Sequence, residues 1–99
     1  MEKISIAGLK RFFQSNIGRK IEAEWPEIRI VGNLGVVEQK FPRTKRVIKA
    51  VKGNEVLFDT EKGVSYLHFG KGDYAYIGNG VIEIYSGEDN KLAVRYFVK

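Results

Sequence analysis

Residues 44–85 read TKRVIKAVKGNEVLFDTEKGVSYLHFGKGDYAYIGNGVIEIY, and turn signals divide this apolar-rich stretch into short segments of similar length. The breaks fall at Gly53-Asn54, Glu61-Lys62-Gly63, Gly70-Lys71-Gly72 and Gly78-Asn79-Gly80. Glycine and asparagine tolerate the positive φ angles that tight hairpin turns require, so each break has a conformational reason. The pattern predicts an antiparallel meander of strands, and this meander decides the fold.

A short amphipathic helix is predicted before the meander. Ser5 is a suitable N-cap for three apolar residues at helical spacing, Ile6, Leu9 and Phe13. We expect the helix to cover about residues 5–16 and to stop at Gly18. A helix of this length is not stable alone in water, so it must pack on the sheet.

Further strands are expected on both sides of residues 44–85. Residues 19–25 alternate apolar and charged side chains and should form a half-buried strand that ends at Pro26. Residues 91–99 alternate most cleanly and should form the closing strand. The pattern in residues 27–41 is compatible with a hairpin or with a long crossing loop, and the sequence leaves both open.

These elements predict one domain over residues 1–99, with the β meander over about 19–99. The expected class is α+β: a short N-terminal helix packed on a strongly curved antiparallel sheet, or on a small SH3-like barrel, of six to seven strands. The chain contains no cysteine, and no apolar stretch has the length of a membrane span. We therefore expect a cytoplasmic protein.

Positive charge is concentrated in one segment. Between residues 40 and 52 there are six basic residues and no acidic one: Lys40, Arg43, Lys45, Arg46, Lys49 and Lys52. The net charge of the chain is +5, and without these six it has 11 basic and 12 acidic residues. This basic segment therefore holds the whole excess of positive charge, and it is the first candidate for contact with an anionic partner.

The sequence contains no pattern typical of an enzyme. His68 is the only histidine, and Ser65 points to the other face of the same predicted strand. Asp59 or Asp73 on an adjacent strand is a possible carboxylate partner for His68, but a single histidine in a sheet is far more often structural. We expect no catalytic residue.

No metal or cofactor site is predicted either. Glu22 and Glu24 should point the same way, as two carboxylate ligands would, but the interleaved Lys20 is more typical of a solvated strand face. Gly70-Lys71-Gly72 resembles a fragment of a phosphate-binding loop, but it lacks the Walker spacing and the following helix, so a hairpin turn is favoured.

Three tyrosines extend the candidate binding site beyond the basic segment. Tyr66, Tyr74 and Tyr76 lie on predicted strands near it and can stack on nucleobases. Small barrels bind single-stranded nucleic acid by combining charge along the backbone path with rings under the bases. Aromatic residues are also normal in strand cores, so the rings alone do not establish binding.

Part of the chain resembles small accessory proteins of prophages and integrative elements. The resemblance lies in residues 46–58, RVIKAVKGNEVLF, and 63–69, GVSYLHF, which match a recurring basic strand, Asn-containing turn and Ser-aromatic-Leu-aromatic-Phe strand. It covers about the middle third of the chain and departs from the pattern at Gly70, where a proline is expected. The class includes antirestriction and anti-CRISPR inhibitors, so the resemblance implies a binding module without assigning any functional residue.

Two functions follow as hypotheses. The first is a non-enzymatic binding protein that contacts nucleic acid through the basic segment and the nearby tyrosines. The alternative is a protein-protein inhibitor or adaptor that acts on a host defence or nucleic-acid machine. If the 12 acidic residues share a face with the basic segment, they repel phosphate, whereas a protein partner can accommodate mixed charge.

The basic segment itself has two possible registers. One turns Val47 and Val51 to the core and Lys49 with them; the other turns Ile48 and Ala50 inward and presents Lys45 and Lys49 together. We predict the second, because an unpaired buried lysine costs more than two exposed valines. In this register Arg46 and Lys52 reach around the strand edge. The strand can follow both registers, one after the other, only if it contains a bulge.

Overall fold

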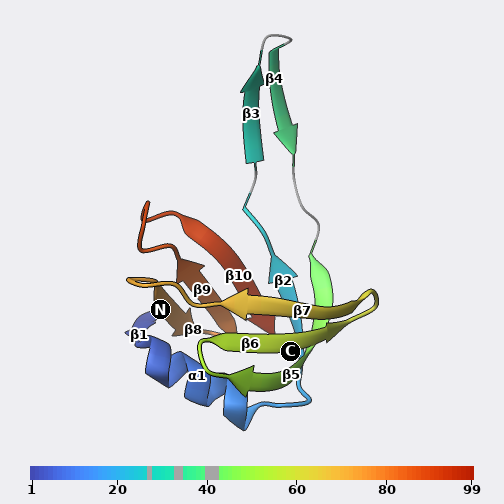
Figure 1. Cartoon of the computed structure of the whole chain (residues 1–99), viewed down its shortest axis with the longest axis vertical. Coiled ribbons are helices and arrows are strands. Elements are labelled where there is room, and N and C mark those ends of the chain that lie inside the picture. The colour runs from blue at the N-terminus through green and yellow to red at the C-terminus, as the bar shows by residue number, and fades with distance from the viewer. Residues whose placement is uncertain (27, 33–34, 40–42) are drawn as a thin grey trace.

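The structure, a computed structural model, describes the backbone of residues 1–26, 28–32, 35–39 and 43–99 and the side chains outside residues 27–42 (Figure 1). One helix, α1 (Ile6–Ser15), follows a short strand, β1 (Glu2–Ile4). The remaining strands are β2 (Lys20–Glu24), β3 (Ile28–Gly32), β4 (Gly35–Gln39), β5 (Thr44–Lys52), β6 (Glu55–Thr60), β7 (Gly63–His68), β8 (Tyr74–Gly78), β9 (Val81–Tyr85) and β10 (Leu92–Val98).

The predicted α+β class is confirmed, but the sheet is larger than expected and it is not closed. Eight antiparallel strands form one curved sheet in the order β1-β8-β9-β10-β2-β5-β6-β7. The prediction of six to seven strands missed β1, which is only three residues long. Strands β1 and β7 are the two free edges, so the sheet is not a barrel.

Strand β2 divides the expected continuous meander into two halves. It pairs with β5 on one side and with β10 on the other, so β5-β6-β7 and β8-β9-β10 are separate three-stranded units. Strands β10 and β2 therefore lie at the centre of the sheet, and β6 lies next to the edge strand β7. Ile21 and Ala23 of β2 are fully buried and Trp25 packs on the core, as the alternation predicts.

The predicted hairpin turn at Gly70-Lys71-Gly72 is also wrong. This segment joins β7, at one edge of the sheet, to β8, which lies next to the opposite edge. A short connection suffices because the sheet curls (Figure 1). The Asp73 carboxylate fixes it by accepting hydrogen bonds from Gly70 N at 2.7 Å and from Gly87 N at 3.0 Å. Any side chain at Gly87 would clash with the Gly72 backbone.

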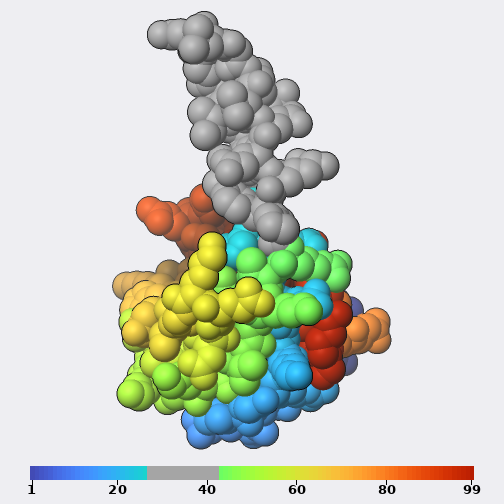
Figure 2. All heavy atoms as spheres, turned by 90° about the vertical axis from the view of Figure 1, so that its right-hand side faces the viewer, coloured from blue at the N-terminus to red at the C-terminus, as the bar shows by residue number. Residues whose placement is uncertain are grey.

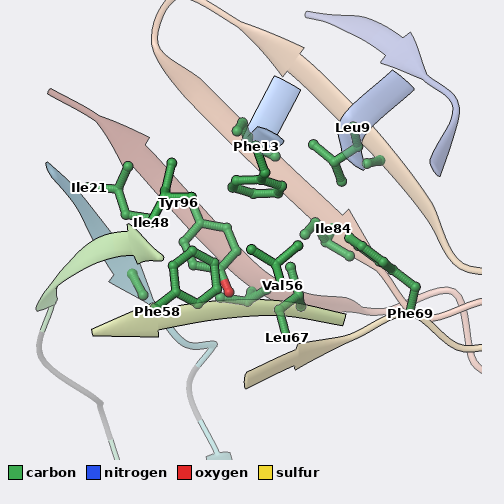
Figure 3. Close-up of a cluster of buried hydrophobic side chains, with 14 residues drawn as sticks. Leu9, Phe13, Ile21, Ile48, Val56, Phe58, Leu67, Phe69, Ile84 and Tyr96 are labelled. Atoms are coloured by element: carbon green, nitrogen blue, oxygen red, sulfur yellow. The ribbon is translucent and has the colours of Figure 1, made fainter. Parts of the chain in front are cut away.

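The core fills the concave side of the sheet, which we call the inner face. Helix α1 contacts both β5 and β8 and so bridges the two halves. It begins as predicted, because Ser5 Oγ accepts a hydrogen bond from Gly8 N at 3.0 Å. Phe13 packs edge-on against Phe58 and Tyr96, whose rings stack with their centroids 5.4 Å apart (Figure 3).

Strand β5 contains a bulge at Lys49, and the side-chain alternation before the bulge differs from the alternation after it. Ile48 pairs with Phe58 and is fully buried, as the favoured register predicts. The pairing then shifts at Lys49, so that Val51, opposite Val56, also packs against the core. Ala50 is only half-buried and lies opposite Leu57. The expectation that Ala50 points inward is therefore wrong, because the bulge changes the alternation after Ile48.

Strands β3 and β4 form the hairpin that the sequence left open. They pair from Ile28–Gln39 to Gly32–Gly35 in a two-stranded antiparallel sheet of their own. In Figure 1 this hairpin extends away from the eight-stranded sheet between β2 and β5.

The one helix in the described part of the chain, α1, is too short and too polar to cross a membrane.

Candidate binding surface

The pleat of β5 divides the basic segment between the two faces of the sheet. Lys45 and Lys49 are exposed on the convex side, which we call the outer face, and are co-facial as predicted. Arg46 is buried on the inner face, so the prediction that it reaches around the strand edge is wrong. Lys52, the last residue of β5, is exposed and pairs with Glu55 of β6. Lys40 lies outside the described residues.

Arg46 is held by hydroxyl groups and aromatic rings. Its Nη1 donates a short hydrogen bond to Ser65 Oγ, and its Nε donates to Thr44 Oγ1 at 3.4 Å. The guanidinium lies 5.4 Å from the centre of the Trp25 ring and 6.0 Å from that of Phe58. A buried arginine needs such partners, since losing its hydration is costly. Arg46 is therefore part of the core, and it links β5 to β7.

A row of alternating charges crosses the outer face. We call it the charge ladder, and in order it consists of Lys99, Glu22, Arg43, Glu24, Arg95 and Glu83. The shortest ion pair joins Arg95 Nη2 to Glu83 Oε2 at 2.7 Å, and Arg43 Nε lies 3.0 Å from Glu24 Oε2. Each neighbour in the row has the opposite sign, so most charge on this part of the face is compensated within the molecule.

The ladder also changes the acidity of its members. Hydrogen bonding to Arg43 is the main reason why the pKa of Glu24 lies below its usual value, and the Arg95 guanidinium adds to the effect. Hydrogen bonding to Glu83 raises the pKa of Arg95. Arg43 is fixed further by the Phe97 ring, whose centre lies 3.7 Å from its guanidinium carbon. The ladder is thus a connected network with defined geometry.

A groove of about 650 Å³ lies beside the ladder, over β2, β5 and the β6–β7 turn. It is lined by charged side chains of both signs, Lys20, Lys45 and Lys99 with Glu22, Asp59 and Glu61, together with Val47 and Thr60. In Figure 2, β2 in blue, β5 and β6 in green and the end of β10 in red share this side of the molecule. The groove is large enough for a few residues of an extended peptide.

The exposed lysines in and beside the groove differ in their contacts. Lys49 Nζ lies 3.5 Å from Asp59 Oδ1, and Lys99 Nζ lies 3.3 Å from Glu22 Oε1. Lys45 faces Glu22 across the β2–β5 pair. Within the described residues, neither Lys45 nor Lys20 has a carboxylate within 4.0 Å.

The structure separates the three predicted tyrosines into two sites. Tyr66 is 59% exposed on the edge strand β7, whereas Tyr74 and Tyr76 lie on β8, with five strands between them. Tyr85 of β9 joins the second site: its ring stacks on Tyr74 with centroids 5.3 Å apart, and Tyr76 meets both rings edge-on. Burial, with the nearby Glu83, raises the pKa of the Tyr85 hydroxyl.

The only histidine has a different carboxylate neighbour from those predicted. His68 Nδ1 lies 3.5 Å from Glu55 Oε1, and its side chain is 68% exposed. Asp59 contacts Lys49 and Asp73 holds the loop next to β8, so neither reaches His68. Among the residues that the structure describes, no three His, Asp or Glu side chains converge as metal ligands do.

Sequence reasoning missed five participants of the outer face: Glu83, Tyr85, Arg95, Phe97 and Lys99. The alternation of residues 91–99 does place Arg95 and Phe97 on one face, and residues 20–24 place Glu22 and Glu24 on one face. The missing information was the pairing of β2 with both β5 and β10, which brings these rows together.

Comparisons with protein-family models, with curated protein sequences and with solved structures find no match to this chain. The outer face must therefore be interpreted from its own chemistry.

Proposed function

We propose that this chain is a non-enzymatic binding protein that contacts a protein partner through the charge ladder and the adjacent groove. The observation that carries the proposal is the alternation of sign along the ladder. Phosphate backbones attract cations that are not compensated, and here Arg43, Lys49, Arg95 and Lys99 all have carboxylate neighbours. A protein surface with charges of both signs can match such a row.

The groove favours a partner segment of mixed character. Val47 and the aliphatic parts of the lysine side chains supply apolar contact, and the surrounding charges can orient a peptide that carries both signs. The resemblance to accessory proteins of mobile elements points to a component of a host defence or nucleic-acid machine as the partner. In this role the chain is an inhibitor or adaptor.

The test is capture from a host lysate with three immobilised proteins: the wild type, Lys45→Glu/Lys49→Glu, and the control Lys71→Glu/Lys91→Glu. The control makes the same charge change in the exposed loops after β7 and β9. The proposal expects a protein that remains bound to the wild type and to the control after nuclease treatment, and that is lost from Lys45→Glu/Lys49→Glu. Equal capture by all three proteins would remove this face as the binding site.

Nucleic acid is the second candidate, and one observation favours it. Lys20 and Lys45 line the same groove from neighbouring strands without a carboxylate within 4.0 Å among the described residues. If only these two contact phosphates, log affinity against log salt has a slope of about −1.8. If the five cations of the basic segment other than the buried Arg46 do so, the slope is roughly −3.5 to −4.5. Fluorescence anisotropy with single-stranded and duplex oligonucleotides at two salt concentrations distinguishes these cases, and no binding at low salt removes the candidate.

A further inference from the structure

The two free edges of the sheet differ in how well they are protected against pairing. Strand β1 has three residues and carries Glu2 and Lys3. Strand β7 has six residues, GVSYLH, with no lysine, arginine, carboxylate or proline. Proteins commonly protect long edge strands with charges, proline or bulges, because unpaired backbone groups otherwise attract another strand. By this standard the β7 edge is unprotected.

The hydrogen bonding of β7 shows which backbone groups are free. Phe69 N donates to Asn54 O at 2.8 Å, which makes residues 54 and 69 a hydrogen-bonded pair. In an antiparallel ladder such pairs alternate, so Phe58–Ser65 is also hydrogen-bonded and Leu57–Tyr66 is not. The N–H and C=O groups of Val64, Tyr66 and His68 therefore point away from β6, toward the open edge.

The side chains beside these free groups are apolar and exposed. Four large hydrophobic residues are exposed in the described part of the chain, and two of them, Val64 at 41% and Tyr66 at 59%, lie on β7. Both are on the outer face, opposite Asp59 and Leu57 of β6. An edge that combines free backbone groups with exposed apolar side chains has the features of a strand-pairing surface.

We propose that β7 pairs antiparallel with β7 of a second copy of this chain, so that the two sheets become continuous. The pairing is two-fold symmetric about Ser65: Ser65 faces Ser65 of the second copy, and Val64 faces Tyr66. Aromatic and β-branched residues form favourable cross-strand pairs, and this symmetry makes the contact twice. Because the strand has no lysine, arginine or carboxylate, two chains of net charge +5 can approach here without direct repulsion.

Charge complementarity at the ends of the strand supports a second copy as the occupant. In this register Lys62 of one copy faces His68 of the other, and His68 is the neighbour of Glu55 on β6. Lys62 lies in the β6–β7 turn and Glu55 at the start of β6, so the pairing places the Lys62 cation of each copy at the end of the strand where the other copy has Glu55. The same contact occurs twice because of the symmetry.

The test is sedimentation velocity from about 5 µM to about 500 µM, because a dimer of this kind depends on protein concentration. We compare the wild type with Val64→Lys/Tyr66→Lys, which places lysine opposite lysine, and with Ile17→Lys as a matched control. Ile17 is 46% exposed and lies between α1 and β2. The expected result is a wild-type and control dimer and a dissociation constant at least about tenfold higher for the double variant.

A charge-swap experiment separates loss of pairing from loss of folding. Val64→Glu/Tyr66→Glu should also be monomeric alone, and mixing it with Val64→Lys/Tyr66→Lys should give a one-to-one heterodimer. Circular dichroism confirms that each variant is folded before mixing. A wild type that is monomeric at every concentration overturns the proposal. So does a wild-type dimer whose dissociation constant is unchanged in Val64→Lys/Tyr66→Lys. The proposal is also overturned if the lysine and glutamate variants are both folded but do not associate when mixed. Failure here leaves the proposed partner-binding function untouched, since that function is measured at Lys45 and Lys49.

Discussion

The inner and outer faces of the sheet use the same residue types for different purposes. On the inner face Arg46 is buried against Trp25 and donates hydrogen bonds to hydroxyl groups. On the outer face Arg43 packs on Phe97 but pairs with Glu22 and Glu24 and remains 47% exposed. The first arginine joins strands within one molecule, and the second presents charge to the surroundings. Composition alone does not distinguish them, because the pleat decides which face each residue joins.

The tyrosines also differ between the inner and the outer face. Tyr96 is almost fully buried between Phe13 and Phe58, and burial raises the pKa of its hydroxyl strongly. Tyr74 and Tyr76 lie on the outer face, half-buried against Tyr85. If this division into a structural face and a binding face is correct, substitutions on the two faces must differ in stability and in binding.

The largest expected effect is on the inner face. Phe58→Ala should lower the free energy of unfolding by about 3 to 5 kcal/mol, because it removes the ring that packs on both Phe13 and Tyr96. The control is Phe97→Ala, which deletes a half-buried ring from the outer face. Urea unfolding measures both. A cost for Phe97→Ala as large as that for Phe58→Ala would contradict the division.

A smaller effect is expected at high pH. Tyr96 stays protonated in the folded state, while the unfolded chain releases this proton above pH 10. Its stabilising contribution is therefore present below pH 10 and decreases above it, by about 1.4 kcal/mol per pH unit. Unfolding of Tyr96→Phe between pH 9 and about pH 11 should lose correspondingly less stability than the wild type. Identical pH profiles would mean that burial does not hold this proton.

At acid pH we expect the protein to lose the stability that the charge ladder contributes, and this effect should be smaller than the one at high pH. Since the folded-state pKa of Glu24 is lowered, the stability that Glu24 contributes is present above its usual value of 4.5 and is lost as the pH falls through the lower folded value. Glu24→Gln should flatten the decline of stability below that pH, whereas the exposed Glu88→Gln should not. Thermal unfolding from pH 7 to about pH 3 compares them, and equal profiles would show that the ladder does not act on Glu24.

The sequence was most informative where local patterns determine the structure. The cap at Ser5, the alternation in β2 and the turns at Gly53 and Gly63 depend on neighbouring residues only, and all were predicted. The position of β2 between β5 and β10 is non-local, so a pattern along the chain could not show it. The segment Gly70-Lys71-Gly72 also has the composition of a hairpin turn, although it connects the two halves of the sheet.

The candidate site could be predicted only in part for the same reason. Lys45 and Lys49 follow from the register of one strand, but the bulge at Lys49 decides that Val51 also turns inward. Arg46 was misplaced because its partners Trp25 and Ser65 come from other parts of the chain. The charge ladder joins residues far apart in the sequence, such as Glu24 and Arg95, which are 71 positions apart, and Glu22 and Lys99, and only the fold brings them together.

The smallest effect on stability is expected at the lysines proposed for binding. Lys45→Glu/Lys49→Glu should leave the melting temperature within a few degrees of the wild type, because the pair of Lys49 with Asp59 is about half exposed and such pairs contribute little. The same variant should no longer bind the partner. A large loss of stability would show that these lysines are structural and that the binding face lies elsewhere.

The central claim is that the basic segment is divided between the two faces, and it is tested most directly by thermal unfolding of Arg46→Ala and Lys45→Ala. The two residues are adjacent and both substitutions remove one positive charge. Losing the buried contacts of Arg46 should cost about 2 kcal/mol, or a melting temperature roughly 8 to 16 °C lower. Lys45→Ala should change it by less than about 3 °C. Equal shifts for the two variants, or a larger shift for Lys45→Ala, would contradict the account.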